Sequence, residues 1–487
     1  MKMKISRVYA PIGILFFALT AAYCSKKSVV TPELSVSSSE ITFQPDGGVT
    51  DVTITSNVDW NIGNSASSWL QVSQTTGNSG QATIRLTTAS NVTGAARSAV
   101  LMVNAGNSQV RRVNIKQASS LYPGYNISPA PADASGMGSN AVQLAAKFKL
   151  GWNIGNTLEA IGGETAWGNP LISESYIRAV KQQGFNAIRL PCSWDQHSDK
   201  ATAKIQEDWL NRVKQVVQYC ANNDMYVLLN IHWDGGWLDA NINRAKQDSV
   251  NAKQKAFWEQ IATTMRDFDE HLMFASANEP PAENAEQMDI LNSYHQTFIN
   301  AVRSTGGRNS YRVLVVQGPS TDIEKTGNLM NTLPTDKVKD RMMVEVHYYG
   351  PSQFCLLMDG DASWGKMFYY WGAGHHSTIE PDRNATWGEE SYLSTTFSIM
   401  KTKFTDKQIP VILGEYGTYR RGNNKYVPKD LATHNDAVDY WLTYATKQAI
   451  ANGMKPFYWD TGGALDRRNN NTVLDQRSVS AILAGSN

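Results

Sequence analysis

The segment LMFASANEPP, residues 272–281, begins as an apolar run and ends in a carboxylate between an amide and two prolines. A short apolar run bounded by proline is typical of a buried β-strand. Nothing in strand structure requires Asn278 and Glu279 at its end, because a buried carboxylate is costly unless it is paired. The segment therefore predicts a strand whose last residues carry a function.

Similar apolar runs alternate with segments of helical periodicity across residues 145–487. Including the first, the runs are FKLGWNIG (148–155), NAIRLP (186–191), MYVLLNIH (225–232), LMFASANE (272–279), VLVVQG (313–318), MMVEVHYY (342–349), PVILGEYG (410–417) and KPFYWD (455–460). Helices are expected at 174–183, 205–221, 252–268, 285–304, 389–403 and 434–452, with weaker signals near 335 and 475. Strand-then-helix units repeated in this way predict an α/β fold, a (β/α)8 TIM barrel.

The C-terminal ends of barrel strands meet at one face, where catalytic side chains lie in this fold. Polar and aromatic residues follow nearly every predicted strand at that end. In strand order they are Asn156, Arg189, His232, Asn278, Glu279, Gln317, His347, Tyr349, Glu415 and Trp459. Any one of them could be a capping amide or a core histidine, but together they indicate a catalytic face.

Two carboxylates, Glu279 and Glu415, are expected across this mouth from each other. Paired carboxylates flanking a cleft suit cleavage of a glycosidic bond. One must be protonated to release the leaving oxygen, and the other must be ionised to attack the anomeric carbon. Their surroundings should therefore push the two pKa values apart.

The N-terminus has the layout of a secretory signal. MKMKISR is basic, VYAPIGILFFALTAA is apolar and too short for a membrane span, and Cys24 follows within YCSKK. This order predicts a signal peptide at 1–23, lipidation of Cys24, a tether at 24–32 and an exported outer-membrane lipoprotein on either membrane face. Ordinary secretion, with Cys24 removed with the signal, is the alternative.

Residues 33–118 contain short strand-like runs and turn signals, which predict a small all-β, immunoglobulin-like sandwich. The segments VDWNI, SSWLQVS, GNSGQATIRLTTASN, ARSAVLMV and VNIKQAS resemble the BACON module of carbohydrate-active proteins. Trp60 and Trp69 could form a sugar platform, but packing in the sandwich core is the favoured interpretation. The module could equally be a spacer. Residues 119–144, rich in Pro, Gly and Ser, are expected to be a linker that wraps onto the next domain.

Composition narrows the function classes. A net charge of +1 over 487 residues gives no electrostatic case for a nucleic-acid partner. The 14 tryptophans suit either a core or sugar-stacking platforms. Cys192, Cys220 and Cys355 are expected to be buried and unpaired. A monomer is expected.

The motifs IRLP, NIHW, ANEP, VHYY, GEYG and YWD resemble glycoside hydrolase family 5, a group of retaining (β/α)8 glycosidases, over residues 140–487. The resemblance implies that Glu279 is the general acid/base and Glu415 the nucleophile, and that Asn278 bonds the sugar 2-hydroxyl. It implies that Arg189 lies near Glu415 and keeps it ionised, while Tyr349 orients it. Glu279 then needs a partly desolvated site, because its pKa must lie near the working pH.

The resemblance also implies that His347 and His232 line the catalytic subsite and that Trp459 is the platform under the sugar. In retaining enzymes the two carboxyl groups lie about 5–5.5 Å apart. No cofactor and no metal are expected, because the histidines lack the spacing of metal ligands.

GWNIGNTLEA and ETAWGNP resemble subfamily 4, which contains endo-β-1,4-glucanases, xyloglucanases and mixed-linkage glucanases. Asn156 and Trp167 are then expected at the non-reducing-end subsites. Many relatives carry two adjacent histidines after the third strand, whereas Trp233 follows His232 here, and Trp237 is expected to widen the stacking surface. The aromatic-rich segment 350–390 is expected to stack glucose units or accommodate xylose branches, although half of its aromatics could simply pack the loop down.

These features together favour a retaining endo-β-1,4-glucanase acting on plant cell-wall glucan, with xyloglucan first. A broad cellulase or mixed-linkage glucanase and a mannanase are the alternatives within the class. A glycan-binding lipoprotein on an inactive barrel would show affinity without cleavage, and a barrel enzyme of other chemistry would need ligands that the sequence does not display.

Overall fold

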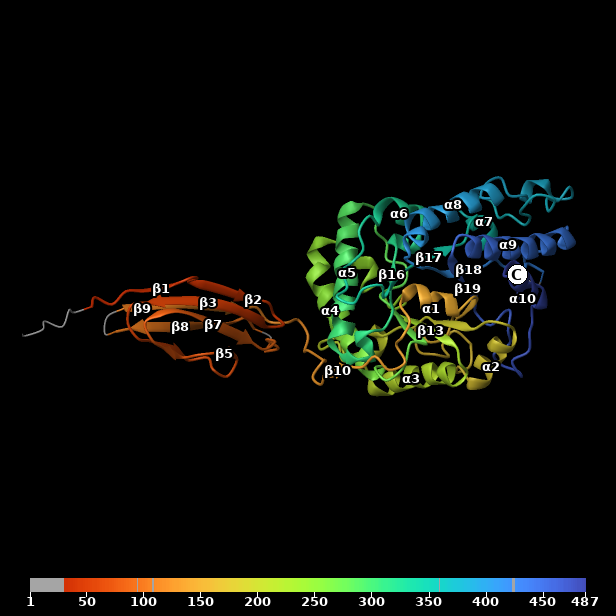
Figure 1. Cartoon of the computed structure of the whole chain (residues 1–487). Helices are drawn as coiled ribbons and strands as arrows, with labels where there is room; N and C mark the ends of the chain where they lie inside the picture. The colour runs from red at the N-terminus through yellow and green to blue at the C-terminus, as the bar shows by residue number, and fades with distance from the viewer. Residues whose placement is uncertain (1–29, 94, 107–108, 359, 423–424) are drawn as a thin grey trace, which may run out of the picture. The chain divides into compact units, whose positions relative to one another are not determined.

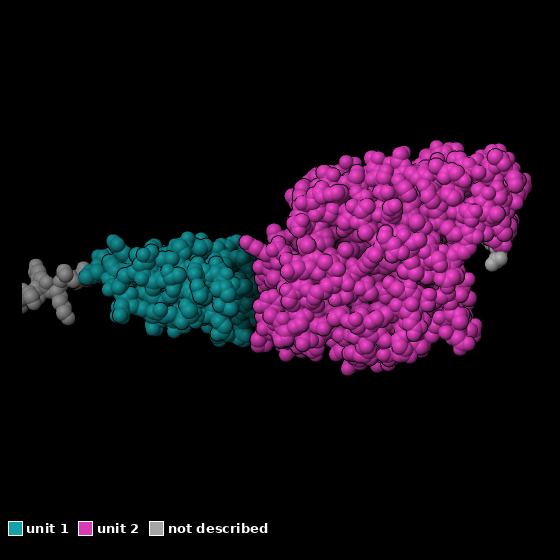
Figure 2. Space-filling view, turned by 45° about the vertical axis from the view of Figure 1, so that its right-hand side comes forward, with its two compact units in different colours: residues 1–91, 96–118 teal, residues 92–95, 119–487 magenta. Residues whose placement is uncertain are grey.

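The computed structural model describes residues 30–487 except for 94, 107–108, 359 and 423–424. They form two compact units, one of the described residues up to Asn91 with 96–118, and one of 92–95 with 119–487 (Figure 2). The predicted signal peptide and Cys24 lie outside the described residues. Within the described part of the chain, no helix is long and apolar enough to cross a membrane.

The first unit is a pair of β-sheets, visible in Figure 1 as the strands in red and orange. One sheet has the order β1 (Leu34–Val36), β3 (Gly48–Ser56), β7 (Gly80–Thr88) and β5 (Leu70–Val72). The other has the order β2 (Glu40–Phe43), β9 (Gln109–Gln117), β8 (Arg97–Ala105), β4 (Trp60–Asn64) and β6 (Thr76–Gly77). Alternate residues of β8, namely Ala99, Leu101 and Val103, are buried, which is the pattern of a strand with one face on a core.

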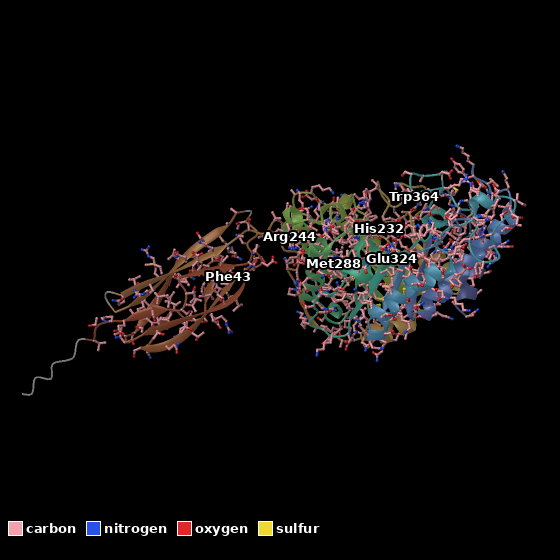
Figure 3. The ribbon with its side chains drawn as sticks, turned by 90° about the horizontal axis from the view of Figure 1, so that it is seen from above. Phe43, His232, Arg244, Met288, Glu324 and Trp364 are labelled. Carbon is pink, nitrogen blue, oxygen red and sulfur yellow. The ribbon has the colours of Figure 1, made fainter. Side chains whose placement is uncertain are left out.

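Both tryptophans of this unit serve its core. Trp60 is 2% exposed, and a Cβ at Gly77 would overlap its ring, so a glycine is needed there. Trp69 is half-buried against the same core, with the guanidinium of Arg97 4.5 Å from its ring centroid. Phe43 lies in this core too and marks it in Figure 3.

The second unit is built on a closed barrel of parallel strands, so the predicted (β/α)8 fold is confirmed. Each predicted run supplies one strand. Around the barrel these are β11 (Gly151–Ile154), β12 (Ala187–Leu190), β13 (Tyr226–Asn230), β14 (Leu272–Ala275), β16 (Leu314–Gln317), β17 (Met342–Tyr348), β18 (Val411–Tyr416) and β19 (Met454–Asp460). β19 pairs with β11 and closes the ring.

Helices follow the barrel strands. They are α2 (Glu174–Gln182), α3 (Glu207–Asn222), α4 (Arg244–Thr264), α5 (Ala285–Ser304), α6 (Ile323–Leu329), α7 (Ser352–Cys355), α8 (Glu390–Lys403), α9 (Leu431–Ala451) and α10 (Gln476–Gly485). The predicted helix 252–268 is displaced, because the Asn243 side chain accepts from the Lys246 amide and caps α4 eight residues earlier. The weak signal near 335 is wrong: α6 ends at Leu329, and 330–341 is irregular.

The N-terminal end of the barrel is closed by α1 (Ala141–Lys147). Leu144 of this helix and Phe148, directly after it, pack into one apolar cluster with the inward-facing Leu228, Met273 and Phe457. The segment expected to be a linker belongs to the barrel unit: β10 (Ala130–Ala132) pairs with β15 (Gly306–Gly307). The barrel therefore has one apolar, plugged end and one open end.

Cys192, Cys220 and Cys355 are buried and unpaired, as expected from the sequence. Burial raises the pKa of all three thiols, so each remains a protonated thiol at neutral pH.

Candidate active site

Arg189 lies at the centre of the open end of the barrel. Its guanidinium is fully buried and lies 2.8 Å by Nε from Glu345 Oε1 and 2.7 Å by Nη1 from Glu415 Oε1. Nη2 donates to Asn278 Oδ1 at 2.8 Å. Burial lowers the pKa of Arg189, but the two carboxylates raise it by more, so the guanidinium stays protonated. Through these bonds one cation contacts side chains from three other strands or strand ends, β17, β18 and the end of β14.

Glu415 receives donors at both carboxylate oxygens. Arg189 reaches Oε1, and the phenol of Tyr349 donates to Oε2 at 3.0 Å. Charge-assisted bonds of this kind are short and strong, and they fix the orientation of a carboxylate. Glu415 is buried, and its side chain is held in a single pose at the end of β18.

Glu279 lies across the mouth from Glu415. One oxygen of each carboxylate and a ring nitrogen of His347 all lie within 4.8 Å of one another. The Glu279 side chain is 46% exposed and so faces the cleft, unlike the buried Glu415. Two carboxylates this close can act on one sugar, which is the arrangement of a retaining glycosidase.

His347 bonds to Glu279 through Nδ1 at 2.8 Å. Burial lowers the pKa of His347, but Glu415, Glu279 and Glu345 together raise it to about 9. At neutral pH this imidazole is therefore a cation that donates from both ring nitrogens.

The pKa of Glu279 differs from the expectation drawn from the sequence. Removal from water raises it, but the hydrogen bond and positive charge of His347 lower it by more, so the net shift is downward. Desolvation was expected to bring this pKa up to the working pH, and in the unliganded protein that expectation is wrong. The missing contribution was a histidine cation 68 residues away in the sequence.

Asn278 precedes the acid and is oriented by Arg189. Since its carbonyl oxygen accepts from Arg189, its amide nitrogen is turned away from that cation and is available to a sugar hydroxyl. The contact of this side chain with the sugar 2-hydroxyl, which the resemblance implied, stays a prediction.

Trp459 and His232 flank the site with parallel rings, with centroids 6.0 Å apart and planes 9° apart. Gly155 makes room for the indole, because a Cβ there would lie 2.8 Å from the ring. Burial, Arg189 and His347 all lower the pKa of His232, so it is neutral. Figure 3 labels His232 within the barrel unit.

The outer candidate residues divide into exposed and packed ones. Trp167 is 48% exposed and Trp233 is 47% exposed, so both rings are open to a ligand. Asn156 adopts a left-handed backbone with φ 59°, and its carbonyl accepts from Asn169. Trp237 differs from the prediction, because its ring packs edge-on against Phe257 at 5.4 Å and contributes to the core.

The loop from 350 to 390 is largely packed. Phe368, Tyr369, Tyr370 and Trp371 are buried, and Tyr370 donates to the buried Glu380 at 2.7 Å. His375 stacks on Tyr440 and His376 bonds to Glu389. The exposed aromatics of the loop are Trp364, at the outer edge in Figure 3, and Trp387. The alternative that about half of these aromatics hold the loop down describes the structure better than a continuous stacking surface.

Sequence reasoning missed two buried residues of this cluster. Asn153 accepts from Arg189 Nη1 at 3.1 Å, and Glu345 lies under Arg189 and His347. Both stand inside strands and read as part of an apolar run. The signal available for Glu345 was its position two residues before His347, which puts both on the same face of a strand.

Comparison with known proteins agrees with this geometry. A model of the cellulases (glycosyl hydrolase family 5) matches residues 153–464, and one of BACON, a putative N-terminal binding domain, matches residues 58–118. The chain therefore belongs to glycosyl hydrolase family 5, a retaining family, and is a glycoside hydrolase.

Relatives cover the chain to different extents. The xyloglucan-specific endo-beta-1,4-glucanase BoGH5A of Bacteroides ovatus is 32% identical, with 99% of this chain and 98% of that protein aligned. Endoglucanase A of Paenibacillus barcinonensis is 34% identical over 76% of this chain and 95% of its own length.

Solved structures show the same relation. The Bacteroides ovatus family 5 xyloglucanase in complex with a XXXG heptasaccharide has a TM-score of 0.69 at 30% identity, covering 94% of this chain and all of the other. XEG5B, a xyloglucan-specific beta-1,4-glucanase from a ruminal metagenomic library in complex with XXLG, has a TM-score of 0.66 at 40% identity, over 72% of this chain and 96% of its own.

Proposed function

We propose that this glycoside hydrolase is an endo-β-1,4-glucanase that cleaves xyloglucan backbones by double displacement. The observation that carries the chemistry is the pair of carboxylates, Glu279 and Glu415, with oxygens within 4.8 Å of each other. The preference for xyloglucan is supported by similarity over nearly the whole chain to a xyloglucan-specific enzyme.

In the first displacement Glu415 attacks the anomeric carbon of a sugar held on Trp459. Arg189 and Tyr349 hold the attacking carboxylate in place. Glu279 gives its proton to the glycosidic oxygen, and the leaving chain departs. In the second displacement Glu279 takes a proton from water, and that water releases the sugar from Glu415.

Room beside the backbone supports a branched substrate. A hollow of 240 Å³ is lined by His347, Tyr349, Glu324, Trp387 and Tyr392. A second hollow, of 170 Å³, lies by Trp459, Asp460 and Tyr419. An unbranched glucan would leave such side spaces to water, whereas xylosyl branches could enter them.

The test compares initial rates on xyloglucan, carboxymethyl-cellulose, mixed-linkage glucan and mannan at equal mass concentration. We expect reducing ends to appear fastest from xyloglucan. Equal rates on all four would contradict the preference for xyloglucan, and a higher rate on cellulose or mannan would replace it by the corresponding activity. Binding without release of reducing ends would favour the glycan-binding alternative. Proton NMR of the first products should show the β-anomer, since two inversions retain configuration.

We further propose that Cys24 is acylated and anchors the protein to the outer membrane. The support is the order of charges and apolar residues in the first 24 positions. Metabolic labelling with a fatty acid should mark the wild-type protein and not Cys24→Ser. Equal labelling of both, or release of both into the medium, would contradict the anchor.

The sandwich unit we propose to be a spacer, because its two tryptophans are committed to packing. In a full-length chain inactivated by Glu415→Ala, Trp69→Ala should leave the affinity for xyloglucan unchanged. A several-fold loss of affinity would assign glycan binding to this unit.

A further inference from the structure

Glu345 is a buried carboxylate to which the reaction described above gives no part. It lies inside the barrel on β17, and its side chain is fully buried. Its Oε2 accepts from Gln317 Nε2 at 2.5 Å. A charge in such a place is costly unless it is paired, so its partners should explain its presence.

One oxygen of Glu345 lies against two cations. Oε1 is 2.8 Å from Arg189 Nε and 3.3 Å from His347 Nε2. The Arg189 Nη2 and His347 Nε2 nitrogens are themselves only 3.4 Å apart. Without an anion at this point, two like charges would face each other in a dry site, and the imidazole would lose its proton because Arg189 cannot.

The backbone is built around this oxygen. A Cβ at Gly414 would overlap Glu345 Oε1, so the residue before the nucleophile has to be glycine for the carboxylate to fit. Withdrawal from water raises the pKa of Glu345, but Arg189 and His347 lower it by more, so it is ionised. The position is therefore a built anion site rather than a chance contact.

The charged and titratable groups that face His347 come from several strands. They are Glu279 beyond β14, Glu345 on β17, Glu415 on β18, Arg189 on β12 and His232 beyond β13, while Tyr349 beyond β17 lines the same hollow as His347. In the part of the chain that the structure describes, only Glu345 contacts Nε2 as an anion, since Glu279 and Glu415 both lie toward Nδ1.

We propose that Glu345 is a positioning residue that keeps both ring nitrogens of His347 protonated, so that His347 holds in reserve the proton that Glu279 delivers. Glu279 begins ionised beside the protonated His347, 2.8 Å away. As the glycosidic C–O bond breaks and the Glu415–carbon bond forms, one proton passes from His347 Nδ1 to Glu279 and from Glu279 to the leaving oxygen. His347 becomes neutral, Glu279 is ionised again as the base for the second displacement, and the total charge is conserved.

This inference rests on the proposed role of Glu279 as the acid, so its test measures the protonation state of His347 directly as well as turnover. In wild-type enzyme labelled with 15N in histidine, His347 should show two ring N–H groups at pH 7 and lose one only near pH 9. The resonance is assigned by its absence in His347→Gln. A neutral His347 at pH 7 would overturn the proposal whatever the substrate is.

Glu345→Gln keeps the shape and removes the charge. We expect the alkaline limb of kcat/KM on polysaccharide to move down by about one pH unit or more, equivalent to a tenfold change in the proton equilibrium. KM should change little, because Glu345 does not reach the cleft. An aryl cellobioside with an activated leaving group needs no proton for departure. With this substrate, the alkaline limb of the glycosylation rate should therefore lie at the same pH in Glu345→Gln as in wild type.

The matched control is Asp336→Asn, which removes one carboxylate of another buried ion pair, 2.6 Å from Arg303 and away from the site. It should lower stability and leave the pH profile unchanged. An unshifted alkaline limb in a folded Glu345→Gln enzyme, or an equal shift in the Asp336→Asn control, would refute the role of Glu345. If Glu345→Gln does not fold, the wild-type histidine titration still decides.

Discussion

The two ends of the barrel are made by the same strands and have opposite chemistry. At the N-terminal end Leu144 of α1 and the adjacent Phe148 pack against a layer of apolar side chains and close the barrel. At the C-terminal end Arg189 is buried among carboxylates that would destabilise any core if they were unpaired. The apolar packing at the plugged end stabilises the barrel. That stability offsets the cost of burying the charged side chains of the preorganised site at the other end.

The largest effect expected at the charged end comes from the nucleophile. Glu415→Ala should lower kcat on glucan by about 10⁵-fold, because removing a nucleophile leaves only the residual catalysis of binding and electrostatics. Reducing-end release measures the loss, and the melting temperature verifies folding. Activity above one per cent in a preparation free of host glucanase would contradict the assignment.

Removal of the central cation should damage both stability and turnover. Arg189→Met leaves Glu345 and Glu415 without their cation, and breaking a buried pair costs about 3–5 kcal/mol. Urea unfolding gives the loss. Arg303→Met, at a buried ion pair outside the site, is the control that should lose stability but keep kcat. If both variants retained full activity, Arg189 would have no role in the reaction.

At the plugged end, a substitution should lower stability without lowering turnover. Leu144→Ala removes buried methyl groups from the apolar layer and should lower the free energy of unfolding by about 2–5 kcal/mol. At temperatures well below its melting point, kcat should stay within twofold of wild type. A selective loss of kcat would show that the two ends are coupled and would break the comparison.

A smaller effect is expected from the phenol on the nucleophile. Tyr349→Phe removes one hydrogen bond to Glu415, and such bonds to a charged group contribute about 1.5–3 kcal/mol. The expected loss in kcat is therefore roughly tenfold to a hundredfold. A change confined to KM would indicate a contact with substrate instead.

The smallest effect is a dependence of stability on pH. The pKa of His347 is raised by its carboxylates from 6.5 to about 9, so its contribution is complete below pH 6.5 and lost as pH rises through 9. The melting temperature of wild type should therefore fall over this window, and less so for His347→Gln. Parallel curves for the two proteins would mean that His347 is not charged in the folded state.

Much of this molecule could be predicted from local patterns. Each apolar run became a barrel strand, and α5 was predicted with its bounds, because Asn284 caps its first turn and the apolar period is clear. The start of α4 was missed because its cap, Asn243, precedes a polar stretch without helical periodicity. Trp237 was expected in the cleft, since the sequence does not say which face of a loop meets Phe257.

By itself the sequence determined the barrel, the sandwich, the family and the two carboxylates, because strand periodicity and strand-end residues are local properties. Only the tertiary structure decided the charge state of the site. The downward shift in the pKa of Glu279 and the role of Glu345 depend on charges brought within a few ångströms from separate strands. Electrostatic interactions in a dry interior depend on those distances, and no local pattern in the sequence encodes them.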